Sequence, residues 1–163
     1  MNEYMVEQLE KKETTATDIL IKASLIVATA LSFLLFFVSS VGTIVFIALV
    51  FADYFLFKRL DVEYEYSYFD GSLDIAKIMS RESRKELFST NIKEEMELLA
   101  PSDAPELQYH QVEKTLDYST KKTGNKTYTM VTLYKGQKVK MIFEPNEKML
   151  NIMKDVAPRK VVF

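Results

Sequence analysis

The sequence predicts an α+β membrane protein: a two-helix transmembrane hairpin, then a small antiparallel β barrel or sandwich of about seven strands with a C-terminal amphipathic helix. Three observations predict this class. Residues 23–52 contain no charged side chain, although the chain has 21 Lys or Arg and 23 Asp or Glu. Residues 62–68, VEYEYSY, alternate apolar and polar side chains, as a half-buried strand does. Apolar residues recur at helical spacing in residues 146–157.

The uncharged stretch is too long for one membrane crossing. As a straight helix it would extend roughly 45 Å, whereas the hydrocarbon core of a bilayer is about 30 Å thick. Its one local break is Ser39-Ser40-Val41-Gly42, which has the residue types of a tight turn. We therefore expect a hairpin over residues 18–60, with crossings at about 19–38 and 42–60.

Basic residues at the ends of the hairpin predict its orientation. Lys11, Lys12 and Lys22 precede the first crossing and Lys58 and Arg59 follow the second, whereas the turn has none. Cytoplasmic segments carry the excess of Lys and Arg. The pattern predicts a multi-pass protein of the cell (plasma) membrane, with both termini cytoplasmic and the turn outside. A signal peptide fits poorly because residues 1–22 are more acidic than basic.

Small residues recur at four-residue spacing in both crossings: Ala28 with Ser32, and Ala48 with Ala52. Such spacing lets two helices approach closely. The helices of one hairpin can use these residues to pack on each other, or they can form the dimerisation face of a homo-oligomer.

Asp53 is the one acid inside the apolar crossings. Measured from the turn it lies roughly 19 Å along its helix, close to the cytoplasmic interface. It can be an interfacial acid balanced by Lys58 and Arg59, or part of a proton or ion relay.

The segment before the hairpin, residues 1–17, has Met1, Tyr4, Met5 and Leu9 at helical spacing. This spacing predicts an amphipathic cytoplasmic helix that lies along the membrane or packs on its own domain. Thr15 and the acid three residues after it resemble a capping box at the start of the first crossing.

Residues 61–163 are expected to form one cytoplasmic domain. Asp70-Gly71 favours a two-residue turn, and every glycine in the chain lies at a proposed turn. Pro145 suits the first turn of a helix over residues 146–157, which Pro158 ends. The expected strands are 62–68, 73–79, 85–90, 96–100, 115–119, 127–134 and 138–143, with residues 92–100 also compatible with a helical turn.

Several segments resemble a known group. A membrane hairpin that leads into VEYEYSYFDGSLDI and later strands resembles bacterial membrane-anchored domains of the pleckstrin-homology (PH) type. The YEY, DG and LDI-KI segments, with FEPNEKML and APRKVVF, resemble more closely a family of small uncharacterised bacterial membrane proteins. The resemblance implies a PH-like fold and no activity.

The sequence contains no motif of a known reaction. Nucleophile-elbow, phosphate-loop, dinucleotide and zinc-protease motifs are absent, and there is no cysteine. His110 is the only histidine, so it has no second imidazole with which to share a metal. A net charge of −2 does not favour nucleic acid. We expect no catalytic residue, cofactor or metal, and hold an enzyme that uses Asp53 or His110 as a third hypothesis.

Basic residues supply the candidate binding surface. Near an anionic leaflet each lysine contributes about 1 kcal/mol of attraction, although solvated strand edges have the same composition. The first functional hypothesis is a non-enzymatic adaptor that binds lipid or protein at the cytoplasmic membrane face. The alternative is a structural accessory subunit of a membrane complex, engaged through the hairpin. The candidate contacts are Lys121, Lys122, Lys126, Lys138, Lys140, Arg159 and Lys160.

Overall fold

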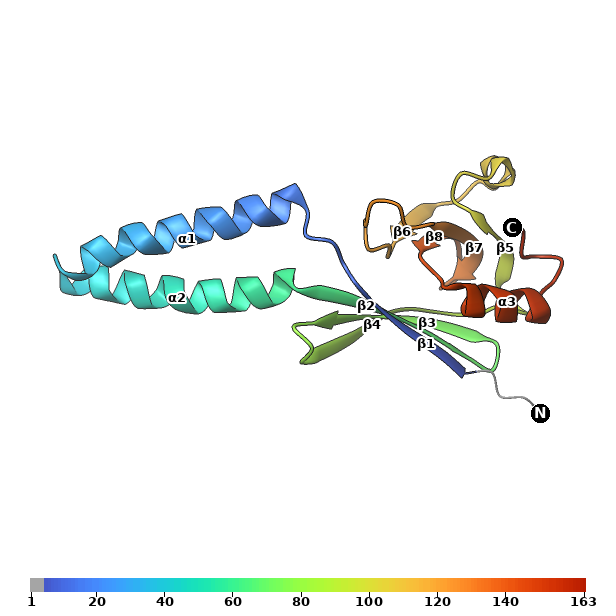
Figure 1. Cartoon of the computed structure of the whole chain (residues 1–163), viewed down its shortest axis with the longest axis horizontal. Helices are drawn as coiled ribbons and strands as arrows, with labels where there is room; N and C mark the ends of the chain where they lie inside the picture. The colour runs from blue at the N-terminus through green and yellow to red at the C-terminus, as the bar shows by residue number, and fades with distance from the viewer. Residues whose placement is uncertain (1–4) are drawn as a thin grey trace. The chain divides into compact units, whose positions relative to one another are not determined.

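The computed structural model describes residues 5–163, which form two compact units. One unit is a pair of helices within Glu13–Val62. The other combines the residues before this pair, up to Lys12, with Glu63–Phe163 (Figure 1). The segment before the helices therefore belongs to the same domain as the chain that follows them.

Two apolar helices form the first unit: α1 (Ala16–Phe36) and α2 (Ser40–Leu60), each of 21 residues. Thr15 caps α1, because its hydroxyl accepts from the Asp18 N–H at 3.3 Å while the Asp18 carboxylate accepts from the Thr15 N–H at 3.0 Å. This capping box confirms the predicted start of the helix. At about 31 Å each, both helices are long and apolar enough to cross a membrane.

The helices of this pair pack closely at a glycine. A methyl group added to Gly42 would lie 2.1 Å from the main-chain oxygen of Leu35, so only glycine permits this approach. Ser32 is buried and Ala52 half-buried, whereas Ala28 and Ala48 are exposed. The four predicted packing residues therefore divide into two inside the pair and two on its outer surface.

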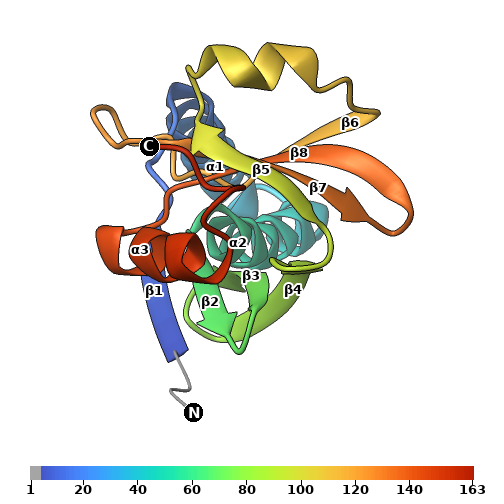
Figure 2. The ribbon, with the colours of Figure 1, turned by 90° about the vertical axis from the view of Figure 1, so that its right-hand side faces the viewer.

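The second unit contains two four-stranded sheets and one α-helix (Figures 1 and 2). The first sheet has the order β1-β2-β3-β4 and the second the order β5-β7-β8-β6. The elements are β1 (Met5–Lys11), β2 (Val62–Phe69), β3 (Ser72–Met79), β4 (Ser83–Asn91), β5 (Met96–Pro101), a 3-10 helix η1 (Pro105–Tyr109), β6 (Lys114–Asp117), β7 (Tyr128–Tyr134), β8 (Gln137–Phe143) and α3 (Glu147–Val156).

One hydrophobic core is shared by both sheets and α3. Tyr66 of the first sheet lies edge-on to Phe143 of the second, with ring centroids 5.8 Å apart. Met149 and Met153 place the apolar face of α3 in the same core, as the helical spacing predicted. The two sheets are not closed into a barrel, so the barrel alternative is wrong.

The N-terminal segment is a strand, and the predicted helix is wrong. β1 pairs antiparallel with β2 over its whole length, from Met5 opposite Phe69 to Lys11 opposite Glu63. Its burial alternates, with Val6 in the core and Glu7 exposed. Pairing with a strand distant in the sequence overrides the local helical spacing. Met1 and Tyr4 of the predicted helix lie outside the described residues.

Two further differences concern the second sheet. The short β6 pairs in parallel with β8, whereas the sequence predicted antiparallel pairing throughout. The last residues also lie along β5, where the Leu99 N–H donates to the Lys160 oxygen at 2.7 Å and the Val162 N–H to the Leu99 oxygen at 2.8 Å. The tail therefore covers part of an edge that would otherwise be open.

Candidate functional site

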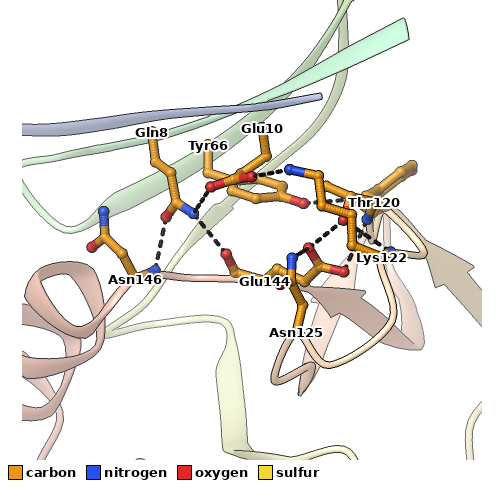
Figure 3. Close-up of polar contacts among 9 residues, drawn as sticks. Gln8, Glu10, Tyr66, Thr120, Lys122, Asn125, Glu144 and Asn146 are labelled. Carbon is orange, nitrogen blue, oxygen red and sulfur yellow. Dashed lines mark hydrogen bonds and ion pairs between the residues drawn. The ribbon is translucent and has the colours of Figure 1, made fainter. Parts of the chain in front are cut away.

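The candidate site is the β6–β7 loop, residues 118–127, which carries three of the predicted lysines. Glu144, which directly follows β8, is only 5% exposed and holds this loop in place through hydrogen bonds. Its carboxylate accepts from the Thr120 N–H at 3.0 Å, the Thr120 hydroxyl at 2.6 Å and the Asn125 amide at 3.0 Å (Figure 3). Three donors thus satisfy a carboxylate that has lost its water.

The strand β1 also binds this loop. The amide of Gln8 donates to the Glu144 main-chain oxygen at 2.9 Å and accepts from the Asn146 N–H at 2.7 Å. Two residues later, Glu10 forms an ion pair of 2.9 Å with Lys122 of the loop (Figure 3). The first strand of the chain thereby fixes both the loop and the start of α3.

A buried tyrosine completes the support. The Tyr66 hydroxyl donates to the Tyr118 main-chain oxygen at 2.7 Å. Burial, together with the nearby Glu144 carboxylate, raises the pKa of Tyr66 far above its usual range. The phenol therefore stays neutral and continues to donate at any physiological pH.

Asp117 and Lys121 form an ion pair at the start of the loop. Burial alone would raise the pKa of Asp117, but hydrogen bonds from Lys121 and Ser119 outweigh it, and the pKa lies below its ordinary value. The depressed pKa of Asp117 stabilises the folded domain at pH values above the ordinary pKa of an aspartate. This stabilisation is lost as the pH falls through the lower pKa that Asp117 has in the folded state.

We expect Lys121→Met to move the pKa of Asp117 upward, because the substitution removes the main stabilising partner of the charged form. An NMR titration of the Asp117 carboxyl carbon measures the shift. Lys126→Met is the matched control and should leave this pKa unchanged. Equal titration curves in the two variants would show that Lys121 does not hold the carboxylate.

Lys126 differs from the other two lysines of the loop. It is exposed and makes no ion pair or hydrogen bond within the part of the chain that the structure describes. It lies between two open grooves, of about 700 Å³ and about 360 Å³, and lines both together with Asn125 and Tyr128. Ser102, Asp103 and Phe163 also line the larger groove, and Gln8, Glu10 and Glu147 also line the smaller one.

The other predicted basic residues lie elsewhere in the domain. Lys138 forms an ion pair of 2.8 Å with Glu97, and Lys160 donates to the Lys93 main-chain oxygen at 2.7 Å. Arg159 is exposed beside a small groove of about 210 Å³. Lys140 lies half-buried on β8, opposite Thr115 of β6 and Val131 of β7. Acids already pair with three of the seven predicted basic residues, Lys121, Lys122 and Lys138.

The residues of the enzyme hypothesis lie in different units. The His110 ring contacts Glu97 at 3.4 Å. The hydrogen bond from Lys138 is the main cause that lowers the pKa of this glutamate. Asp53 lies in the helix pair, where its Oδ2 accepts from the Thr29 hydroxyl at 2.6 Å. Its buried Oδ1 has no partner among residues 5–163. Within that range no group of His, Asp or Glu is arranged to hold a metal.

Sequence reasoning missed Glu144, Thr120 and Gln8. Along β8 the inward-facing residues are Val139, Met141 and Phe143, so alternation places the next residue on the solvent side. The strand ends at Phe143, and this change of direction buries the carboxylate. No local pattern in the sequence indicates it.

Residues 2–163 match a protein family that is described as a bacterial PH-like domain and has no known function. No curated protein and no solved structure matches the chain.

Proposed function

The chain belongs to the family of bacterial PH-like domains, and from this premise we propose that it is a membrane-anchored, non-enzymatic binding module. The helix pair is the anchor, a transmembrane hairpin in the bacterial cell membrane. The β domain remains on the cytoplasmic side, where it binds a protein or lipid partner.

The observation that carries this proposal is the pairing of β1 with β2. The chain leaves β1 at Lys11, passes through α1 and α2, and returns to β2 at Val62, directly beside the strand that it left. Two strands that share hydrogen bonds lie on the same side of a membrane, which supports an even number of crossings between them. Lys22 near the start of α1, and Lys58 and Arg59 in the last turn of α2, support the cytoplasmic side.

The exposed surface of the helix pair supports a lipid environment. Only 6% of the most apolar window of each helix is buried, whereas the core helix of a soluble protein is mostly buried. Side chains such as Leu20, Leu31 and Phe51 are more than half exposed. Surfaces of this extent and composition need a covering of lipid or protein.

The β6–β7 loop is the surface that we assign to binding. Its backbone is fixed by Glu144 and β1, so little conformational entropy is lost when a partner docks. Lys126, which has no partner among residues 5–163, can pair with an anionic or polar group, and the exposed Phe163 beside it supplies apolar area. A fixed loop with a free cation between two grooves is suited to recognition.

Photo-crosslinking in living cells tests this assignment. A photoreactive amino acid replaces Thr123, an exposed residue of the loop, in one variant and Lys85, an exposed lysine of β4, in the control. We expect a discrete adduct at position 123, lost when the chain also carries Lys126→Glu, and no adduct at position 85. Identical adducts at both positions, or none at 123, would reject the loop as the binding surface.

A second candidate function is an accessory subunit held by its membrane helices. The exposure of Ala28 and Ala48 on the outside of the helix pair favours it, because small exposed residues permit close packing of another helix. Ala28→Leu with Ala48→Leu should then release the chain from a membrane complex. Native electrophoresis with unchanged co-migration would reject this function.

A further inference from the structure

The turn between α1 and α2 differs from a turn that faces water. Phe37, Val38 and Val41 are 72%, 78% and 70% exposed, and no charged residue lies between positions 23 and 52. We propose that lipid acyl chains cover this turn, residues 37–41, in the outer half of the bilayer. This inference rests on the proposed anchor function, and it corrects the expectation that the turn lies outside the membrane.

Four backbone N–H groups at the turn are paired within it. The N–H groups of Val38 and Ser39 both donate to the Leu35 oxygen, at 3.1 and 3.3 Å. The Ser39 hydroxyl accepts from the Gly42 N–H at 3.1 Å. The Thr43 N–H donates to the Ser39 oxygen at 3.2 Å. An unpaired backbone group in hydrocarbon costs several kcal/mol, so each of these internal bonds favours burial in lipid.

Aromatic residues distinguish the two ends of the helix pair. Phe33, Phe36, Phe37 and Phe46 cluster at the turn, with the rings of Phe33 and Phe37 5.1 Å apart. None of these rings has a polar group for the headgroup region. The other end has Tyr54, with Lys58 4.7 Å from its ring centroid, which is the combination typical of a membrane–water interface. The turn therefore has the chemistry of the hydrocarbon region.

The length of the helices agrees with this placement. At 1.5 Å per residue, Phe37 lies about 22 Å along the axis from Lys22, and Ser40 lies about 27 Å from Lys58. Both lengths are below the roughly 30 Å of the hydrocarbon core, and any tilt shortens them further. When Lys22 and Lys58 lie at the inner interface of the bilayer, the turn therefore does not reach the outer interface.

Depth measurement with a fluorescent label tests the inference. The chain has no cysteine, so single-cysteine variants of the full chain accept one environment-sensitive fluorophore without other changes. Val38→Cys and Val41→Cys report on the turn. Ile47→Cys, on the exposed side of α2, is the control in lipid, and Glu13→Cys, before α1, is the control in water. The vesicles contain phosphatidylcholine and phosphatidylglycerol, with iodide on both sides.

We expect the labels at positions 38 and 41 to resemble that at 47. A nitroxide on the acyl chains should quench all three, and iodide should quench them several-fold less than it quenches the label at 13. Strong iodide quenching at 38 and 41, with protection at 47, would overturn the inference and leave the anchor intact. Quenching by iodide at all four positions would instead refute the proposed anchor. Protection from both quenchers at 38 and 41 would mean a protein cover and would also overturn the inference.

Discussion

Glu144→Ala is expected to lower the free energy of unfolding by about 3 kcal/mol, because it leaves the Thr120 N–H and hydroxyl buried without an acceptor. Thr120 is 0% exposed, so water cannot replace the lost carboxylate. The loop should become mobile before the domain unfolds. Chemical unfolding of the full chain in detergent micelles, followed by the near-ultraviolet circular dichroism of its tyrosines, measures the loss.

Glu147→Ala is the matched control for this prediction. Glu147 lies three residues later, in the first turn of α3, and is exposed. A surface substitution of this kind changes stability by about 0.5 kcal/mol or less. Hydrogen exchange should show faster exchange of the amides of residues 118–127 only in the Glu144 variant. If both alanine variants unfold at the same denaturant concentration, Glu144 does not support the loop.

Gly42→Ala is expected to force α1 and α2 apart. Alanine favours a helix over glycine by about 1 kcal/mol, so helix propensity alone predicts a stabilised α2. The added methyl group would, however, lie 2.1 Å from the Leu35 oxygen, where neither main chain can yield without a shift of the whole helix. Overpacking of this kind costs about 2 kcal/mol, so the contact outweighs the propensity.

Pulsed electron paramagnetic resonance measures the separation between nitroxides at Leu34 and Ile44, both exposed residues near the turn. The distance distribution should shift to longer values in Gly42→Ala and broaden further in Gly42→Leu. Val41→Ala, which removes exposed rather than buried atoms, should leave the distribution unchanged. A Gly42→Ala distribution that matches the unsubstituted chain would show that the helices do not pack through this glycine.

Local patterns predicted the elements that local forces determine. The break at Ser39–Gly42 predicted where the first helix ends and the second begins. Ser39 caps α2, because its hydroxyl accepts from the Gly42 N–H. Alternation predicted β2 and β8, and the Asp70-Gly71 pair predicted the turn into β3. The apolar stripe predicted α3 to within a residue at each end.

What the sequence did not predict depends on contacts between distant parts of the chain. The apolar residues of β1 have helical spacing when this segment is considered alone. The segment forms a strand because it pairs with β2, which follows the helix pair in the sequence. The sequence identifies seven basic residues, but it does not show that acids on other strands pair with Lys122 and Lys138. Lys126 differs from Lys121 and Lys122 because, among residues 5–163, no acid pairs with it.

Cysteine accessibility in cells tests the central claim, that the helix pair is embedded in a membrane and returns the chain to the side it left. Single cysteines replace Glu13, before α1, and Asp155, an exposed residue of α3. We expect a membrane-impermeant thiol reagent to label neither position in intact cells and both in inverted membrane vesicles. Labelling of position 13 or 155 on intact cells, or recovery of the chain in the soluble fraction without detergent, would contradict it.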